Sequence, residues 1–561
     1  MTRRVFALVL AALVSSLTLQ AGSTPARARR GMVVSQNHLA SDVGWRVIER
    51  GGNAVDAAVA TALALAVTHP TAGNIGGGGF LVFRAADGQA VSYDFREAAP
   101  AGSNAEMWLT DGKYDFNLHH NSHRSVGVPG TVAGLHLAWK EHGSRPWKEL
   151  VEPAVALARD GFEVSIGLAR SLAGQIDEFK RYPASLAQFT KNGTPYEAGD
   201  VLKQPDLART LQRIADAGPA GFYEGETAAL IEKEMQANDG LITRADLRNY
   251  QARRRDVVRG QYRGYEIIGM APPSSGGIGV IEMLNILEGY DLKANGYGSA
   301  RNTHLIAEAM RRSFADRAQY LGDPDFVTTM PIARLISKEY GETLRKTINP
   351  ERASTSSPTS FTWPTESQET THFSVVDTAR NAVSVTYTLE YGYGSRIVMP
   401  RCGVPAEQRD GRLQRRAGVD DGAGPDQDAA EPGTGRQADA VEHVADDRGR
   451  DNQLFMVTGS PGGRTIINTV LTTIINAVDF GMNAQEVVDA GRMHHQWLPD
   501  RLSLERYMFS ADVVRALTAM GHTVSEGGNQ GVAEVIIVNQ RDNLLEGGVD
   551  RRAPDGGAAG R

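Results

Sequence analysis

The sequence has one cysteine, Cys402, in 561 residues, so no disulfide can form within the chain. It also lacks an excess of positive charge, with a formal net charge of −7 and a pI near 6.0. No basic field is available to attract a phosphate backbone, so we expect no nucleic-acid partner and favour small molecules as ligands. The length suffices for one large globular body or two to four ordinary domains, stabilised by the core alone.

Long apolar runs are scarce, and the longest lies at the N-terminus. Arg3 and Arg4 precede an apolar stretch from Val5 to about Leu19, which small residues follow. This pattern predicts a signal peptide over residues 1–21 and a periplasmic or secreted protein. The alternative is an uncleaved membrane anchor, for which the stretch is short. No later segment of the sequence is apolar enough to cross a bilayer.

The chain alternates between helical and strand patterns. Residues 41–67 predict two helices broken at Gly51-Gly52, and residues 80–97 predict a hairpin with a type I′ turn at Asp87-Gly88. From Pro129 to about Lys338 the pattern is mostly helical. The segments HFSVVD and NAVSVTYTL then predict a second hairpin, and QLFMVTG predicts a strand that leads through SPGG into a helix.

A candidate nucleophile lies where a polar segment meets a strand. Residues 351–369 are rich in Ser, Thr and Pro, which predicts an exposed, mobile segment, and strand character resumes at Thr370. Attack of the Thr370 hydroxyl on the preceding carbonyl of Glu369 would cut the chain and free an α-amino group with an ordinary pKa of about 8. That amine can act as the general base for the hydroxyl. A Thr-Thr pair before a strand is common, so the prediction depends on its neighbours.

The neighbouring motifs resemble the gamma-glutamyltransferase family of N-terminal-nucleophile hydrolases. TTHFSVVD, NAVSVTYTLEYGYGS, VTGSPGGRTI and MHHQWLPD are similar to its small subunit, and GNIGGGGF, YDFREAAP, VGVPGTVAGL, APPSSGG and AEAMRRSFADRAQYLGDP to its large subunit. The resemblance implies an α/β (α+β) fold, a four-layer αββα sandwich with helices outside two mainly antiparallel sheets. It also implies a heterodimer of a large subunit (22–369) and a small subunit (370–561), cut from one precursor between Glu369 and Thr370.

The resemblance also assigns catalytic roles. Thr370 matches the family nucleophile, and Thr388 matches the threonine that hydrogen-bonds to it. Gly462 and Gly463 match the pair whose backbone N–H groups form the oxyanion hole, a use for which glycine permits the required turn.

Two further residues are assigned to substrate binding. Arg96 matches the arginine that binds the α-carboxylate of the γ-glutamyl group, for which a planar guanidinium offers two parallel hydrogen bonds. Without the resemblance, a surface ion pair of Arg96 with Glu97 or Asp94 would be the simpler interpretation. Glu390 occupies a position, asparagine in some members, that faces the amino-acid head of the substrate.

The implied reaction has two steps. Thr370 attacks the γ-amide of glutathione or a related γ-glutamyl compound, and the resulting γ-glutamyl ester is resolved by water or by an amino acid or peptide acceptor. Neither a metal nor an organic cofactor is needed. A cephalosporin or glutaryl acylase of the same fold is the alternative, and Arg96 favours the γ-glutamyl group.

Three other motifs have simpler explanations than a second site. GNIGGGGF lacks the GK[ST] ending of a phosphate loop, so it predicts a close backbone turn. HHNSH (119–123) and MHHQW (493–497) lack a carboxylate cluster or a helical HExxH pattern, and so predict polar loops or packed histidines. TGSPGG has Thr458 where a serine nucleophile elbow needs glycine, so Ser460 is expected to be structural.

Residues 401–450 do not fit the rest of the chain. Their composition, with no aromatic residue and many Arg, Asp, Gly and Ala, is typical of a disordered linker. A second interpretation is a pair of compensating frameshifts: read from the second nucleotide of each degenerate codon, residues 401–418 are compatible with the family-like GAGFLLNNEMGDFNAGPG and residues 437–448 with KRMLSSTSPTIV. These pieces resemble the family's binders of the substrate α-amino and α-carboxylate groups. If the lesion is in the gene, the chain loses a core strand and part of its substrate pocket, and is an inactive remnant.

Overall fold

Two seven-stranded sheets form the centre of the molecule in the computed structural model, which describes residues 23–104, 106–357, 370–407, 441–446 and 453–561. Sheet I has the order β1 (Ala26–Ala28), β20 (Leu544–Val549), β19 (Glu534–Asn539), β15 (Gln453–Gly459), β14 (Val441–Asp446), β11 (Tyr265–Met270) and β10 (Val257–Tyr262). Sheet II has the order β21 (Gly557–Gly560), β2 (Met32–Ser35), β12 (Thr370–Val376), β13 (Ala382–Thr388), β3 (Gly78–Arg84), β4 (Ala90–Asp94) and β9 (Arg253–Arg255). The strand pairs described in these sheets are antiparallel.

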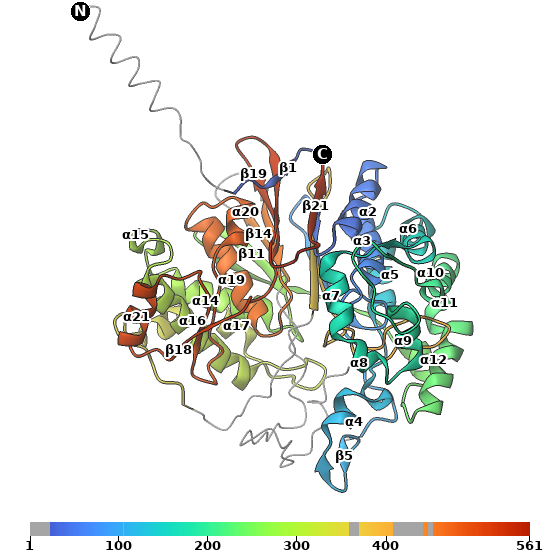
Figure 1. Ribbon diagram of the computed structural model, residues 1–561. Helices are drawn as coiled ribbons and strands as arrows, with labels where there is room; N and C mark the ends of the chain where they lie inside the picture. The colour runs from blue at the N-terminus through green and yellow to red at the C-terminus, as the bar shows by residue number, and fades with distance from the viewer. Residues whose placement is uncertain (1–22, 105, 358–369, 408–440, 447–452) are drawn as a thin grey trace, which may run out of the picture.

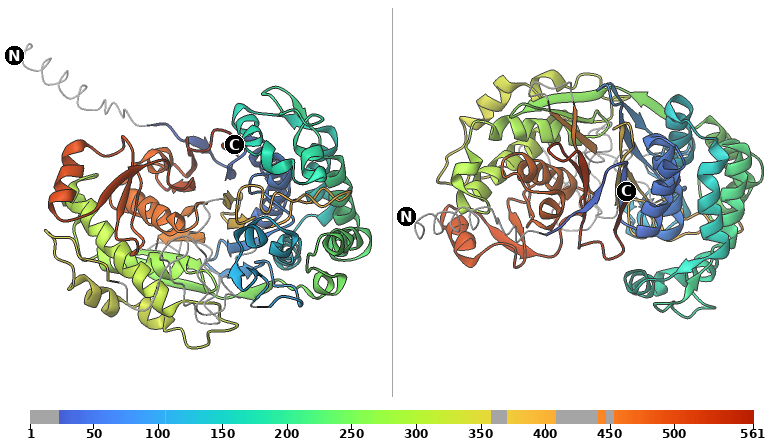
Figure 2. Two further views of the ribbon diagram at one scale, coloured as in Figure 1. Left: turned by 60° about the horizontal axis from the view of Figure 1, so that its bottom comes forward. Right: turned by 90° about the horizontal axis from the view of Figure 1, so that it is seen from above.

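Helices cover the outer face of each sheet, and the two inner faces pack against each other (Figures 1 and 2). Sheet II is covered by α2 (His38–Glu49), α3 (Ala54–Thr68) and α5 (Thr131–His142), with α6 (Trp147–Asp160) packed on α3 and α10 (Pro205–Ala217) on α6. Sheet I is covered by α14 (Gly276–Leu287), α19 (Thr465–Val478) and α20 (Ala484–Asp489), with α16 (Ala300–Tyr320) packed on α14. This is the predicted four-layer αββα arrangement.

The first two helices show how local sequence sets these layers. Gly51, with a φ of 88°, ends α2 in a conformation that glycine adopts without strain. Asn53 then begins α3 with a capping box that Asp56 completes. Because α3 is apolar on every side, it fits only between two layers, and all fifteen of its residues are buried.

One local prediction was wrong, and one region contains strands that the sequence did not predict. The first hairpin does not have a type I′ turn, which needs a positive φ at both central residues, because only Gly88 of the Asp87-Gly88 pair has one, 89°. The stretch from Pro129 to Lys338 is mostly helical, as predicted, but β10 and β11 also lie within it and pair as a hairpin. The polar residues of β10 hide its strand pattern, because only two of its six residues are buried.

The linker interpretation of residues 401–450 was also wrong at both ends of the segment. Cys402, Val404 and Ala406 are buried, and β14 pairs with β11 and β15 inside sheet I. Residues 408–440 and 447–452 lie outside the described part of the chain. The same is true of the expected signal peptide and of Glu369. Among the described residues, no helix combines the length and apolarity that a membrane span requires.

Candidate active site

Thr370 begins a hairpin in the middle of sheet II. β12 and β13 pair over their full length, and the register places Thr370 opposite Thr388. The Thr370 hydroxyl donates a hydrogen bond to Oγ1 of Thr388 at 3.4 Å, while the same oxygen accepts the backbone N–H of Glu390 at 2.7 Å. Thr370 is partly exposed and Thr388 is buried, so the hairpin presents the first hydroxyl and supports it from behind with the second.

Glu390 follows the end of β13 in a conformation that favours a different residue. Its φ is 73°, which lies in the left-handed region where asparagine is the most readily accepted alternative to glycine. The hydrogen bond from its backbone N–H to Thr388 fixes this turn. The side chain extends toward Arg96, with 3.8 Å between Oε2 of Glu390 and Nη2 of Arg96.

Arg96 lies just after β4 and is 8% exposed. Its Nη2 donates to Oε1 of Glu97 at 3.0 Å, and its carbonyl accepts a hydrogen bond from the hydroxyl of Tyr250. The ion pair with Glu97 that the sequence offered as an alternative therefore exists, but it is buried rather than on the surface. A substrate carboxylate that reaches Arg96 must share the guanidinium with Glu97.

A third carboxyl group faces this arginine. Glu407 is fully buried, and its pKa is raised well above the ordinary value by burial and by the carboxylate of Glu97, although the charge of Arg96 opposes the rise. Burial therefore favours the protonated form of Glu407. It belongs to the segment whose reading frame is in question.

The SPGG loop connects β15 to α19 and contains both predicted oxyanion-hole glycines. Gly462 has a φ of 129° and Gly463 a φ of 56°, and a Cβ on Gly462 would lie 2.4 Å from Oγ1 of Thr465. The carbonyl of Gly462 accepts hydrogen bonds from the N–H and the hydroxyl of Thr465 at the start of α19. Because C=O and N–H point in opposite directions across a trans peptide, the N–H of Gly463 points away from that helix.

Ser460 has the structural role expected of it. Its hydroxyl donates to the carbonyl of Pro461 at 2.7 Å and accepts the N–H of Val532 at 3.0 Å. These bonds tie the glycine loop to the segment before β19.

A cavity of about 360 Å³ opens beside Thr370. Thr370 and Gly462 line it together, which places the proposed nucleophile and an oxyanion-hole residue on one space. The rest of the wall comes from parts of the chain that are far apart in sequence: Gln36, Thr68, His69, Thr71, Gly167, Leu168, Ser171, Pro461, Asn529, Gly531, Val532, Arg552, Ala553, Pro554 and Asp555. Sequence reasoning identified none of these wall residues, because no local pattern links positions so far apart.

The predicted site residues therefore fall into two groups, one on each side of Thr370. Gly462 lies with Thr370 on the cavity, whereas Thr388, Glu390 and Arg96 form a chain of contacts leading away from it. Arg96 and Glu390 do not line this cavity.

The remaining motifs have the structural roles predicted for them. Gly76 to Gly79 allow close backbone approach, since a Cβ on Gly77 would lie 2.1 Å from the carbonyl oxygen of Thr388. His119 is packed against Trp108, and Nε2 of His123 lies 3.0 Å from a carboxylate oxygen of Glu234. His494 and His495 are buried and bonded to Asn468 and Asp500.

Comparison with known proteins agrees with this geometry. The family model described as gamma-glutamyltranspeptidase matches residues 40–560. The chain is 43% identical over 544 residues to a glutathione hydrolase proenzyme of Escherichia coli (strain K12), covering 96% of this chain and 93% of the relative.

Two solved structures are similar in fold to this chain. Cephalosporin acylase from Bacillus halodurans superposes with a TM-score of 0.83 at 25% identity, over 97% of this chain and 98% of the acylase. Helicobacter pylori gamma-glutamyltranspeptidase gives a TM-score of 0.56 at 44% identity, over 59% of this chain and 94% of that one. The four layers and these likenesses define an N-terminal-nucleophile hydrolase fold. Within that class, the chain belongs to the gamma-glutamyltranspeptidase family.

Proposed function

We propose that the chain is a precursor that cuts itself before Thr370 and then transfers or hydrolyses γ-glutamyl groups. The observation that carries the proposal is the position of Thr370, the first residue of β12, with its hydroxyl bonded to Thr388 and open to the cavity shared with Gly462. Cleavage at this point turns an internal threonine into an N-terminal one, whose amine can accept the proton of its own hydroxyl.

Each step then has a group to perform it. The Thr370 oxygen forms a bond to the γ-carbonyl carbon while the free α-amino group of Thr370 takes the hydroxyl proton. This amino group then passes the proton to the departing amine, and the C–N bond of the substrate breaks. The backbone N–H groups of Gly462 and Gly463 stabilise the oxygen that becomes negatively charged. Water, or the amine of an amino acid or peptide, next attacks the ester and returns the proton to Thr370.

The substrate assignment depends on Arg96. A relative named glutathione hydrolase and a structural neighbour named cephalosporin acylase present two amide classes. A γ-glutamyl group has an α-carboxylate at its head, and a buried guanidinium is matched to that group by charge and by geometry. We therefore favour glutathione and related γ-glutamyl amides over cephalosporin side chains.

The test combines processing with turnover. Intact mass and gel analysis of the purified chain should give two fragments with a new N-terminus at Thr370, and the same sample should release the anilide from a chromogenic γ-glutamyl anilide. The Thr370→Ala variant should remain one uncut, inactive chain. Efficient release from a glutaryl or cephalosporin amide, with none from the γ-glutamyl anilide, would reverse the substrate assignment.

We also propose that residues 401–450 are out of frame. The support from the structure is Glu407, since three carboxyl groups around one arginine is an arrangement that burial makes costly. Peptide mapping by tandem mass spectrometry of protein from the natural source tests whether residues 401–450 have the printed sequence. Peptides with the printed sequence between residues 401 and 450 would exclude an error in the record.

We also propose that the protein is exported, because an apolar stretch with the pattern of a signal peptide precedes the described residues. N-terminal sequencing of the mature large fragment should find a new start near residue 22. A mature fragment that begins at Met1 would favour the membrane anchor.

A further inference from the structure

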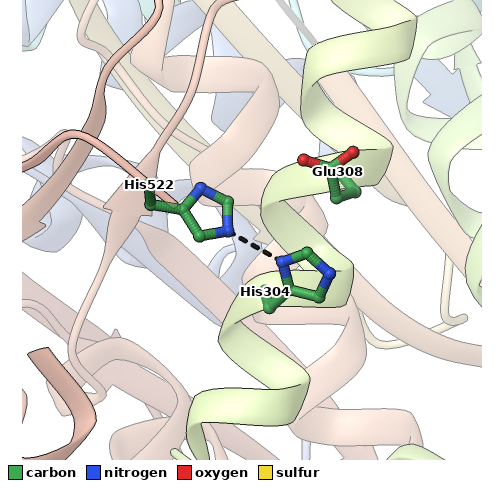
Figure 3. A group of neighbouring side chains, drawn as sticks. All are labelled: His304, Glu308 and His522. Carbon is green, nitrogen blue, oxygen red and sulfur yellow. Dashed lines mark hydrogen bonds between the residues drawn. The ribbon is translucent and has the colours of Figure 1, made fainter. Parts of the chain in front are cut away.

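A buried group of three metal-ligand side chains lies apart from the active-site cavity. His304 and Glu308 are on α16, and His522 follows α21 (Ala511–Ala519); their side chains face one another (Figure 3). One donor atom from each lies within 4.8 Å of the other two, and Nδ1 of His304 is 2.8 Å from Nε2 of His522. The three residues are 0%, 0% and 4% exposed, and none of them lines the cavity beside Thr370.

The backbone fixes all three positions. His304 and Glu308 are four residues apart, which places them on one face of a helix. His522 follows Gly521, whose φ of 99° ends α21, and the N–H of His522 donates to the carbonyl of Leu517 at 3.1 Å. β18 (Val524–Gly527) begins two residues later and pairs with β17 (Leu502–Glu505), so the loop that carries His522 is held at both ends.

The hydrogen bonds of His304 leave a lone pair directed at the centre of the group. Its Nε2 lies 2.8 Å from the backbone carbonyl of Asn349, which can only accept, so Nε2 carries the proton. In the neutral ring, Nδ1 is then unprotonated and faces His522. A ligating histidine is usually oriented in this way, with its other ring nitrogen bonded to a carbonyl or carboxylate.

The ring of His522 is only partly satisfied by hydrogen bonds. Nδ1 of His522 has no hydrogen-bond partner among the described residues, so the contact with His304 satisfies only half of this buried ring.

We propose that His304, Glu308 and His522 bind one divalent transition-metal ion, with Zn²⁺ as the first candidate. Two imidazoles and one carboxylate are a ligand set that Zn²⁺ accepts, with water in the fourth position. Tetrahedral ligands of Zn²⁺ lie roughly 3.3 Å apart, so small side-chain rotations separate the two imidazoles and bring the carboxylate closer. Ca²⁺ and Mg²⁺ prefer sets of oxygen ligands and are excluded by the same donors.

Neighbouring charges set the strength of this site. Arg311 and Arg312 both bond to Glu308, and their positive charges oppose a cation. Asp500 offsets part of this repulsion, since it pairs with Arg311 and with His495. Binding is therefore reversible by chelators and weaker than in a closed structural zinc site.

The metal joins α16 to the loop after α21. If the chain is cut before Thr370, as proposed above, His304 and Glu308 belong to the large fragment and His522 to the small one. The ion then connects the two fragments at a position distant in sequence from the cut. Metal binding itself requires no cut, so failure of the proposed cleavage and failure of the metal site are separately observable.

The test uses the full purified chain after dialysis against a chelator. We expect calorimetric titration to find one equivalent of bound Zn²⁺, and Co²⁺ to give the visible bands of a four-coordinate site. Zn²⁺ should raise the Tm of the wild type. The variants His522→Gln and Glu308→Gln should lose the Co²⁺ bands and the rise in Tm, while His38→Gln, at an exposed histidine, should keep both.

Absence of the stoichiometric equivalent in the wild type would overturn the proposal, as would unchanged binding in both cluster variants. Melting curves without metal show whether each variant is folded. If neither variant folds, the Co²⁺ spectrum of the wild type decides, because a spectrum of the hexa-aqua type means that no protein site exists. Release of the γ-glutamyl anilide should be the same before and after chelation, since the cluster does not reach the cavity.

Discussion

Gly462 offers the sharpest test of the proposed oxyanion hole. Its φ of 129° is one that alanine adopts only under strain, and the added Cβ would lie 2.4 Å from Oγ1 of Thr465, which bonds to the Gly462 carbonyl. The Gly462→Ala variant must therefore rotate the peptide units that carry the N–H groups of the proposed oxyanion hole. We expect a strain of about 1–3 kcal/mol. Loss of one oxyanion donor should lower kcat about 100- to 1000-fold.

Gly481, at the other end of α19, is the matched control. Its φ is 65°, and an added Cβ would have no atom of the described residues within 4 Å, so Gly481→Ala introduces backbone strain without a clash. Both variants should be compared by thermal melting and by kcat per cleaved active site, measured with the γ-glutamyl anilide. Gly481→Ala should lose some stability and retain kcat. The oxyanion-hole assignment fails if Gly462→Ala is folded, cleaved and as fast as the wild type.

Three further results follow from the charges. Arg96→Lys should raise KM for the γ-glutamyl anilide roughly 10- to 100-fold, because it removes one of two charged hydrogen bonds worth about 1.5–3 kcal/mol; the exposed Arg254→Lys should not. In the printed sequence, Glu407→Gln should stabilise the protein in urea at pH 7 but not at pH 4, since a raised pKa makes folding costly only where the unfolded carboxyl is ionised. The pKa of His522 falls from 6.5 to about 4 on folding, so the wild type should lose stability as pH drops through that window; His522→Gln, without metal, should show a flatter pH profile.

Local pattern predicted the hairpin of the nucleophile but not the walls around it. Alternation and a short turn determine β12 and β13 without help from the rest of the chain, and the register follows from the turn. The glycines at 462 and 463 were assigned by the family resemblance, and both have the positive φ that favours glycine. The resemblance, and not the pattern, assigned Arg96.

Long-range contacts escaped prediction for a physical reason. His304 and Glu308 have helical spacing that a sequence can show, but His522 lies 218 residues from His304, and only the fold joins them. The cavity combines Gln36 with Asp555 in the same way. β10 was not predicted because it is an edge strand of sheet I. Such a strand needs few apolar residues, so its sequence does not alternate clearly.

The position of β14 allows the effect of residues 401–450 on folding to be distinguished from their effect on substrate binding. Backbone hydrogen bonds to β11 and β15 do not depend on side-chain identity, so VEHVAD can complete sheet I even if it is out of frame. The groups assigned to the substrate head depend on side chains, which a frame change replaces. We therefore expect the chain with the printed sequence to fold and cut itself. Its KM for the γ-glutamyl anilide should be much higher than that of the protein made from a gene with the frame restored. Similar Tm values with different KM values would support this separation. Equal KM values would mean that residues 401–450 contribute nothing to binding, and a printed chain that stays uncut would mean that β14 alone cannot maintain the sheet.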